Sequence, residues 1–273
     1  MKRLIVAISA IVLFSGFIIP AYKMAELLTA TGNEDTIVLK GNAFFNLGKD
    51  YIDKPVPCTV IIRANGYIKQ DYIFPRAHVS IVTIGTNKTV IVNNTRILTP
   101  VQLFARNNIF VLLMRLYLSD NPQMVFKEMG VNQSQVAYGL ANNRAAYIIG
   151  NDNDQLFIDN ELTVPIMYRL GSANDYALAV VKSYLTDANL ASNKSVIIKD
   201  EKSGVSIDNY ASINTTLPGT VELYDRGTLV QRWEFKDAII FNKAASLNSL
   251  LLSPYDIRKL PTTTQILSPF MLF

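Results

Sequence analysis

The sequence predicts a mainly β protein of the α+β class, in which an antiparallel sheet packs against a few short helices. Short segments rich in β-branched and aromatic residues alternate with turn signals along most of the chain. Residues 109–118 (IFVLLMRLYL) form a helical pattern that is apolar on nearly every side. With 49% hydrophobic residues in 273, the chain can fill a substantial core. Because an apolar helix and an apolar sheet face each need a partner, we expect a strongly curved sheet of roughly ten strands with this helix on its concave side.

Residues 1–21 have the pattern of a secretory signal peptide. Lys2 and Arg3 precede an apolar run from Leu4 to Ile19, which ends at Pro20-Ala21. We expect cleavage after Ala21 and export to the periplasm. The alternative is a retained N-terminal anchor in the inner membrane, although the run falls slightly short of the roughly 20 residues that span a bilayer. Either alternative places the remaining chain outside the cytoplasm.

The next part of the chain predicts a short helix followed by an antiparallel meander. Residues 22–28 place Met24, Leu27 and Leu28 on one side of a helix. Short β-type segments follow, and the Asn65-Gly66 dipeptide is a hairpin signal between two of them. The expected strands cover residues 36–45, 59–64, 66–74, 79–85 and 88–94.

The middle of the chain predicts two helices and then further hairpins. Thr99-Pro100 is a helix start, and we expect this helix to run to about Leu118. A second helix is expected from Asn121-Pro122 to Gly130. In the hairpin that follows, 159–161 is the turn, and Pro165 predicts that its strand lies at an edge or carries a bulge. The expected strands cover residues 134–140, 144–150, 155–158 and 161–170.

A third helix is predicted at about residues 174–190, because Tyr176, Val180, Val181 and Tyr184 fall on one stripe. Strands are expected again at 194–200, 217–224 and 228–240. In the last of these, Trp233 and Phe235 face one side, while Arg232, Glu234 and Lys236 face the other. The tail, residues 247–273, predicts only a short helix near 254–260.

The composition argues against an enzyme and predicts no cofactor or metal. The chain has one Cys and one His, which are too few ligands for a Cys/His zinc site and make a His-based catalytic triad a poor expectation. His78 is expected at the surface and Cys58 as a small buried residue. Residues 151–154 are expected to form a solvated turn, because the glycine and final glutamate of a calcium loop are missing. The net charge of +4 is not gathered into a basic run, which argues against nucleic acid.

Several hairpin motifs resemble the periplasmic outer-membrane lipoprotein-sorting family, the carrier and acceptor proteins of the Lol system. They are VAYGLANNRAAYIIG, QLFIDNELTVPIMYRL and VELYDRGTLVQRWEFKDAIIFN. The resemblance implies an incomplete antiparallel β-barrel, with helices covering its concave side and a hydrophobic cavity for acyl chains. The resemblance covers roughly Thr36 to Asn242, and we expect the half-barrel domain to span residues 22–246. It also makes the helix at 174–190 an insertion.

The resemblance and the apolar helix together predict a periplasmic carrier. Such a protein shields the acyl chains of lipids or lipoproteins during transfer to the outer membrane, with inner- or outer-membrane transfer proteins as further partners. The alternative is an envelope-stress sensor or a structural interaction module on the same scaffold, without carrier activity. Arg115 is expected either to reach solvent or to meet a carboxylate or a lipid phosphate. The candidate ligand-binding residues, for which a plain core role is the alternative, are Phe104, Phe110, Leu113, Arg115, Leu116, Tyr117, Trp233 and Phe235.

Overall fold

The fold is a single large antiparallel sheet with short helices. The computed structural model describes residues 21–28, 34–46, 54–85, 87–97, 107–185, 216–242 and 254–263. These residues contain a 14-stranded sheet in the order β14-β6-β5-β4-β3-β2-β1-β13-β12-β11-β10-β9-β8-β7. The prediction of a mainly β protein is confirmed, with more strands than the ten expected. The sheet is not closed into a barrel, because β14 and β7 form its two ends.

The N-terminal half of the sheet is the predicted meander. Each strand from β1 to β6 pairs antiparallel with the next one along the chain. The turn between β2 and β3 at Asn65-Gly66 is short, and Gly66 there has a φ of +84° that favours glycine. The very short β14, Thr262–Thr263, pairs with β6 in parallel. The strands are β1 (Glu34–Phe45), β2 (Val56–Arg63), β3 (Tyr67–Phe74), β4 (Ala77–Ile84), β5 (Asn87–Val92) and β6 (Thr95–Ile97).

The C-terminal half is a second meander, which begins at the free edge strand β7. Its hairpins include the predicted turn after Asp159, whose carboxylate accepts hydrogen bonds from the Glu161 and Leu162 backbone N–H groups. The strands are β7 (Val136–Ala141), β8 (Arg144–Gly150), β9 (Asp154–Asp159), β10 (Pro165–Gly171), β11 (Tyr176–Tyr184), β12 (Pro218–Asp225) and β13 (Thr228–Asn242).

One prediction in this half is wrong, and another is confirmed by one of its two alternatives. The helix expected at 174–190 is wrong, because Tyr176–Tyr184 is strand β11, paired with both β10 and β12. Its valines are buried on both faces, so the apolar run fits an internal strand as well as a helical stripe. Pro165 carries a bulge, since the register with β9 shifts between Pro165 and Met167. Its strand is nevertheless internal and not at an edge.

The two meanders are joined by the antiparallel pairing of β1 with β13, which we call the β1–β13 junction. It runs from Glu34 opposite Asn242 to Phe45 opposite Gln231. The register shifts between Lys40 and Gly41, and a Cβ on Gly41 would lie 2.0 Å from the Glu234 carbonyl oxygen. Glycine is therefore required at this position, where the backbone of β13 leaves no room for a side chain on β1.

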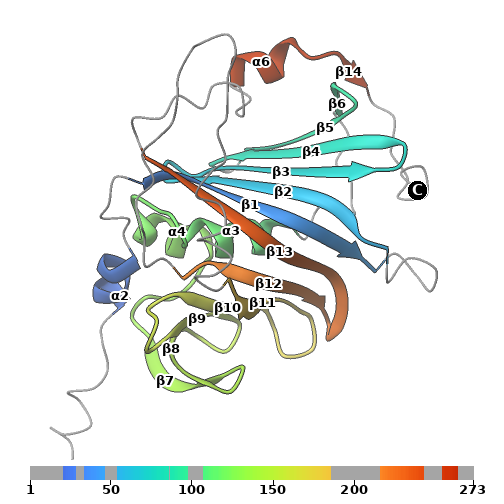
Figure 1. Cartoon of the computed structure of the whole chain (residues 1–273). Coiled ribbons are helices and arrows are strands. Elements are labelled where there is room, and N and C mark those ends of the chain that lie inside the picture. The colour runs from blue at the N-terminus through green and yellow to red at the C-terminus, as the bar shows by residue number, and fades with distance from the viewer. Residues whose placement is uncertain are drawn as a thin grey trace, which may run out of the picture.

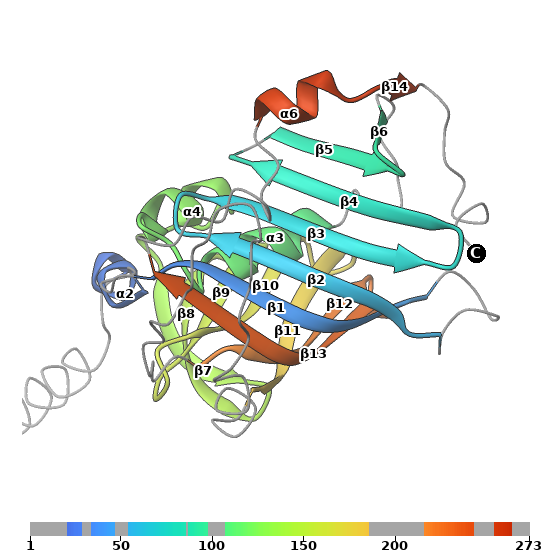
Figure 2. The same cartoon turned by 45° about the horizontal axis from the view of Figure 1, so that its top comes forward.

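Helices cover one side of this sheet, which curves around them (Figures 1 and 2). Helix α3 (Asn107–Arg115) contacts β2 on one side and β10 and β11 on the other, although four strands separate β2 from β10 in the sheet. Helix α4 (Pro122–Glu128) begins at the N-cap Asn121, as predicted. Helix α2 (Ala21–Leu28) buries Met24 and Leu28 but leaves Leu27 exposed, contrary to the prediction. A helix on the concave side is thus confirmed.

The outer face of the sheet also carries a helix. Helix α6 (Pro254–Lys259), predicted near 254–260, packs Ile257 against Tyr67, Val82 and Ile91. Several predicted features lie outside the described residues: the signal or anchor before Ala21, the start of the helix expected at Pro100, the strand at 194–200 and most of the tail. Among the described helices, none has the length and apolar character needed to cross a membrane.

Candidate functional site

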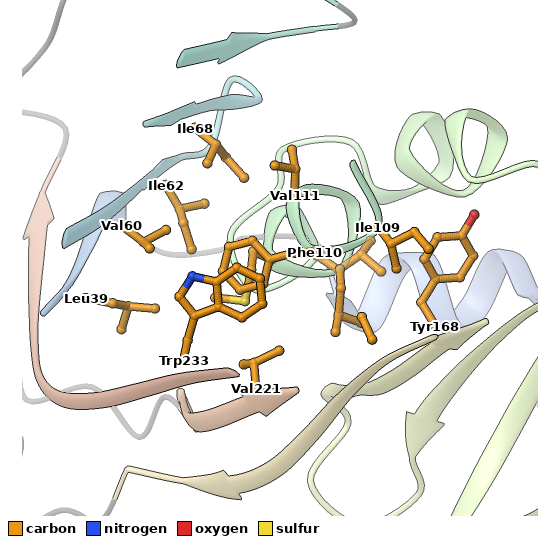
Figure 3. Close-up of a cluster of buried hydrophobic side chains, with 14 of the residues drawn as sticks. Leu39, Val60, Ile62, Ile68, Ile109, Phe110, Val111, Tyr168, Val221 and Trp233 are labelled. Atoms are coloured by element: carbon orange, nitrogen blue, oxygen red, sulfur yellow. The ribbon is translucent and has the colours of Figure 1, made fainter. Parts of the chain in front are cut away.

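The interior of the curved sheet centres on an aromatic stack between helix α3 and strand β13. The rings of Phe110 and Trp233 lie nearly parallel, with centroids 3.8 Å apart, and both side chains are fully buried. Figure 3 shows this pair among aliphatic side chains from both halves of the sheet, including Val60 and Ile62 on one side and Val221 on the other. The alternation of strand residues puts Trp233 inward, because its neighbours Arg232 and Glu234 lie on the outer face.

The structure brings most of the predicted binding residues together in this interior. Phe110, Leu113, Leu116, Trp233 and Phe235 belong to one buried cluster. Tyr117 is partly buried against the same cluster, whereas Phe104 lies outside the described residues. The inner surface of α3 and the facing strands is therefore a continuous apolar layer.

Arg115 lies at the C-terminal end of α3 and is almost fully buried. Its guanidinium forms an ion pair with Glu128 of α4, which decides between the two expectations in favour of a carboxylate partner. The turn between β2 and β3 lies close by, since a Cβ on Gly66 would be 3.1 Å from Arg115 Nη2. The ion pair thus fixes the end of α3 against both α4 and the sheet.

Two tyrosine hydroxyls tie the helices to the C-terminal half of the sheet. Tyr117 donates to the Pro165 carbonyl oxygen at 2.6 Å, at the bulge of β10. Tyr168 donates to the Met129 carbonyl oxygen at 2.6 Å, just after α4. Burial raises the pKa of both phenols, so both remain donors at neutral pH.

A buried polar cluster lies beside the aromatic stack, and sequence reasoning missed it. The Tyr72 hydroxyl accepts hydrogen bonds from Trp233 Nε1 at 3.1 Å and from Gln231 Nε2 at 3.4 Å, and it donates to Gln70 Oε1 at 2.7 Å. Gln70 and Tyr72 lie on the same face of β3 as Ile68 and Phe74 and alternate with the outward residues Lys69, Asp71 and Ile73, so they face the core. That alternation was the signal in the sequence that could have found them.

The remaining residues singled out in the sequence have structural roles, and Cys58 among them belongs to the main buried cluster. Cys58 is a buried free thiol, and burial raises its pKa to about 12. His78 is exposed and lies 3.5 Å from Asp71. Asn151 caps its own turn by accepting from the Asn153 and Asp154 backbone N–H groups. Within the described residues, no group of three or more His, Cys, Asp or Glu side chains is placed to hold a metal ion.

Comparisons by sequence give no relatives. No protein-family model matches the chain, and no curated protein matches it either.

Comparison with solved structures gives matches at low sequence identity. The LolA superfamily protein from Nitrosomonas europaea has a TM-score of 0.47 and 11% identity, covering 87% of this chain and 99% of that chain. An outer membrane lipoprotein-sorting protein domain from Vibrio parahaemolyticus has a TM-score of 0.47 and 8% identity, covering 84% and 94%. MucB, solved in complex with MucA(peri), has a TM-score of 0.27 and 8% identity, covering 86% and 59%. The first two of these structures carry the name of the group that the hairpin motifs resemble.

Proposed function

We propose that the protein is a periplasmic carrier that shields acyl chains of lipids or lipoproteins during transfer to the outer membrane. The acyl chain occupies the interior between helix α3 and the curved sheet, where it replaces the contacts of Phe110 with Trp233. The observation that carries the proposal is this aromatic stack, formed by a short helix against the inner face of a sheet that is not closed into a barrel.

The magnitudes favour an exchange of this kind. Burying one large apolar side chain stabilises a protein by about 1.5 to 3 kcal/mol, and each buried methylene contributes about 0.8 kcal/mol. An acyl chain of about twelve carbons therefore gains roughly 10 kcal/mol on burial, which exceeds the cost of displacing Phe110 and one neighbour. Displacing two large side chains costs about 3 to 6 kcal/mol, so the surplus is roughly 4 to 7 kcal/mol. It corresponds to a dissociation constant between about 1 mM and about 10 μM for this chain length, and longer chains bind more tightly.

Polar contacts hold one end of helix α3 in place, so the acyl chain enters by displacing the other end. The Arg115–Glu128 ion pair and the Tyr117–Pro165 hydrogen bond hold the end of α3 near Arg115. Phe110 lies nearer the start of the helix, where its described contacts are with aromatic and aliphatic side chains. The helix therefore opens from its N-terminal end, with the Arg115 end as the pivot.

Trp233 provides the test, because it is the single tryptophan of the chain. A stearic acid carrying bromine atoms in mid-chain quenches tryptophan fluorescence only on contact. We expect micromolar dibromostearate to quench Trp233, while unbrominated stearate does not.

A matched control moves the reporter out of the interior. The double variant Trp233→Phe, Tyr138→Trp places the indole on edge strand β7, where Tyr138 is 54% exposed. The brominated chain should leave this reporter unquenched. Absence of quenching in the natural chain, or equal quenching in the control variant, would show that acyl chains do not enter the interior.

A second candidate function is an interaction module, such as an envelope-stress sensor, and edge strand β7 favours it. This strand, VAYGLA, carries no charge, pairs in unbroken register with β8 and exposes Leu140 to 77%. Sheet edges of this kind accept a further strand from a partner. Failure of the quenching experiment, combined with loss of partner binding in Leu140→Lys, would favour this candidate.

A further inference from the structure

The inner face of the sheet carries a line of polar groups, which we call the inner polar track. It begins at Trp233 and Gln231, continues through Tyr72 and Gln70, and ends at Thr83 and Lys88. The first part is joined by the hydrogen bonds of the Tyr72 hydroxyl. The second part follows from strand register, since Gln70 is opposite Ile81, and Thr83 is opposite both Ile68 and Lys88. Thr83 is therefore diagonal to Gln70 and directly across from Lys88.

All members of the track face the core and not the outer surface. On β4, Val79 and Ile81 belong to the main buried cluster, and Thr83 lies two residues after Ile81 on the same face of the strand. On β5, Val90 and Val92 belong to the same cluster, and Lys88 lies two residues before Val90 on the same face of the strand. Gln70 is fully buried, Thr83 is 5% exposed, and Lys88 is partly buried.

Two hydrogen-bond donors in this track lack an acceptor among the described residues. They are the Gln70 amide nitrogen and the Thr83 hydroxyl. The orientation of the Gln70 amide is fixed by its neighbours. Trp233 Nε1 and Gln231 Nε2 both donate to the Tyr72 hydroxyl, so the Tyr72 hydrogen is directed to Gln70 Oε1. The Gln70 Nε2 group therefore remains as a donor inside an apolar interior, where an unsatisfied group is costly.

We propose that Gln70 and Thr83 bind the carbonyl oxygen of an acyl ester, and that this contact selects acylated ligands over plain hydrocarbon. The proposal rests on the proposed function, because the acyl chain must occupy the same interior. Burying a carbonyl oxygen without a donor is unfavourable, and the track supplies two donors beside the aromatic stack. The hydrocarbon part of the ligand lies along α3, with the ester at Gln70 and the head group towards Lys88.

The experiment compares two ligands of equal chain length, methyl decanoate and dodecane. Each is used to displace a bound solvatochromic dye from the full chain, and the readout is the ratio of the two affinities within one variant. This ratio cancels any loss of folded protein, which matters because Gln70→Met also removes the acceptor of Tyr72. We expect the ester-to-alkane ratio to fall about 5-fold in Gln70→Met, with a similar fall in Thr83→Val, while dodecane still binds.

Ser80→Ala is the matched control, because Ser80 is also buried on β4 but donates to Asp71 on the outer face. Its ratio should equal that of the natural chain. An unchanged ratio in both Gln70→Met and Thr83→Val would overturn the inference, and the carrier proposal would stand. Failure of both ligands to displace the dye from the natural chain would overturn the carrier proposal together with the inference.

Discussion

Lys88 and Cys58 are buried titratable side chains whose pKa values shift in opposite directions. Burial lowers the pKa of the Lys88 ammonium from 10.5 to about 8 and raises that of the Cys58 thiol from 9.0 to about 12. Between pH 8 and 10.5, the unfolded chain keeps a proton on Lys88 that the folded chain has lost. Stability from this group therefore rises with pH in that window. Between pH 9 and 12, the folded chain keeps a proton on Cys58 that the unfolded chain has lost, so this contribution falls.

The two groups can be separated by measuring unfolding in urea at pH 7, 8 and 9. In this range Lys88 dominates, and the free energy of unfolding of the natural chain should rise relative to that of Lys88→Met, by roughly 1 kcal/mol between pH 8 and 9. Cys58→Ala should keep that rise. Parallel pH profiles for the natural chain and Lys88→Met would mean that the ammonium is hydrated in the folded protein.

At the scale of elements, a buried ion pair between Arg115 and Glu128 joins α3 to α4. The side chains are unequally exposed, 7% for Arg115 and 21% for Glu128. Removing the carboxylate leaves a guanidinium unpaired at the more buried position, whereas removing the guanidinium leaves a carboxylate that water can reach.

Glu128→Ala should therefore destabilise the protein more than Arg115→Met, by about 3 kcal/mol against about 1 to 2 kcal/mol. Denaturant unfolding followed by circular dichroism measures both values. The exposed pair of Arg226 with Asp175 is the control, and Asp175→Ala should cost less than about 1 kcal/mol. Equal losses in the two buried-pair variants would contradict this account.

Strands and helices were predictable wherever the local sequence pattern was compatible with only one type of secondary structure. The alternation in β3 and the Asn65-Gly66 turn predicted a hairpin, and Asn121-Pro122 predicted the start of α4. Residues 176–184 allowed two readings, because apolar residues there fit both a helical stripe and a strand buried on both faces. Only the pairing of β11 with β10 and β12 decides between them.

For the whole molecule, the pairing of strands far apart in the sequence determines which side chains meet in the candidate site. Local sequence patterns could not predict these pairings. Phe110 and Trp233 were predicted as inward residues on different elements, but their stacking depends on the sheet curving around α3. The hydrogen bonds of Tyr72 with Gln231 and Trp233 likewise join strands from opposite meanders across the β1–β13 junction. Such contacts follow from the topology of the sheet.

The β1–β13 junction also makes a prediction for stability. In Gly41→Ala, the added methyl group would lie 2.0 Å from a backbone oxygen of β13, so the two strands must separate locally. We expect a loss of more than about 3 kcal/mol in thermal or urea unfolding. Gly139→Ala on the edge strand is the control. There the nearest atom, 2.9 Å away, is the flexible end of Ile148, and the loss should stay near 1 kcal/mol. Similar losses at both positions would remove the special role of the junction.

The same junction determines when the chain can fold. Strand β1 is synthesised long before its partner β13, since Glu34 pairs with Asn242. Until β13 arrives, β1 presents an unpaired edge to solvent and to other nascent chains. Closing so long a loop makes folding slow compared with local hairpin formation. We therefore expect the chain to need protection from aggregation until β13 is available for pairing.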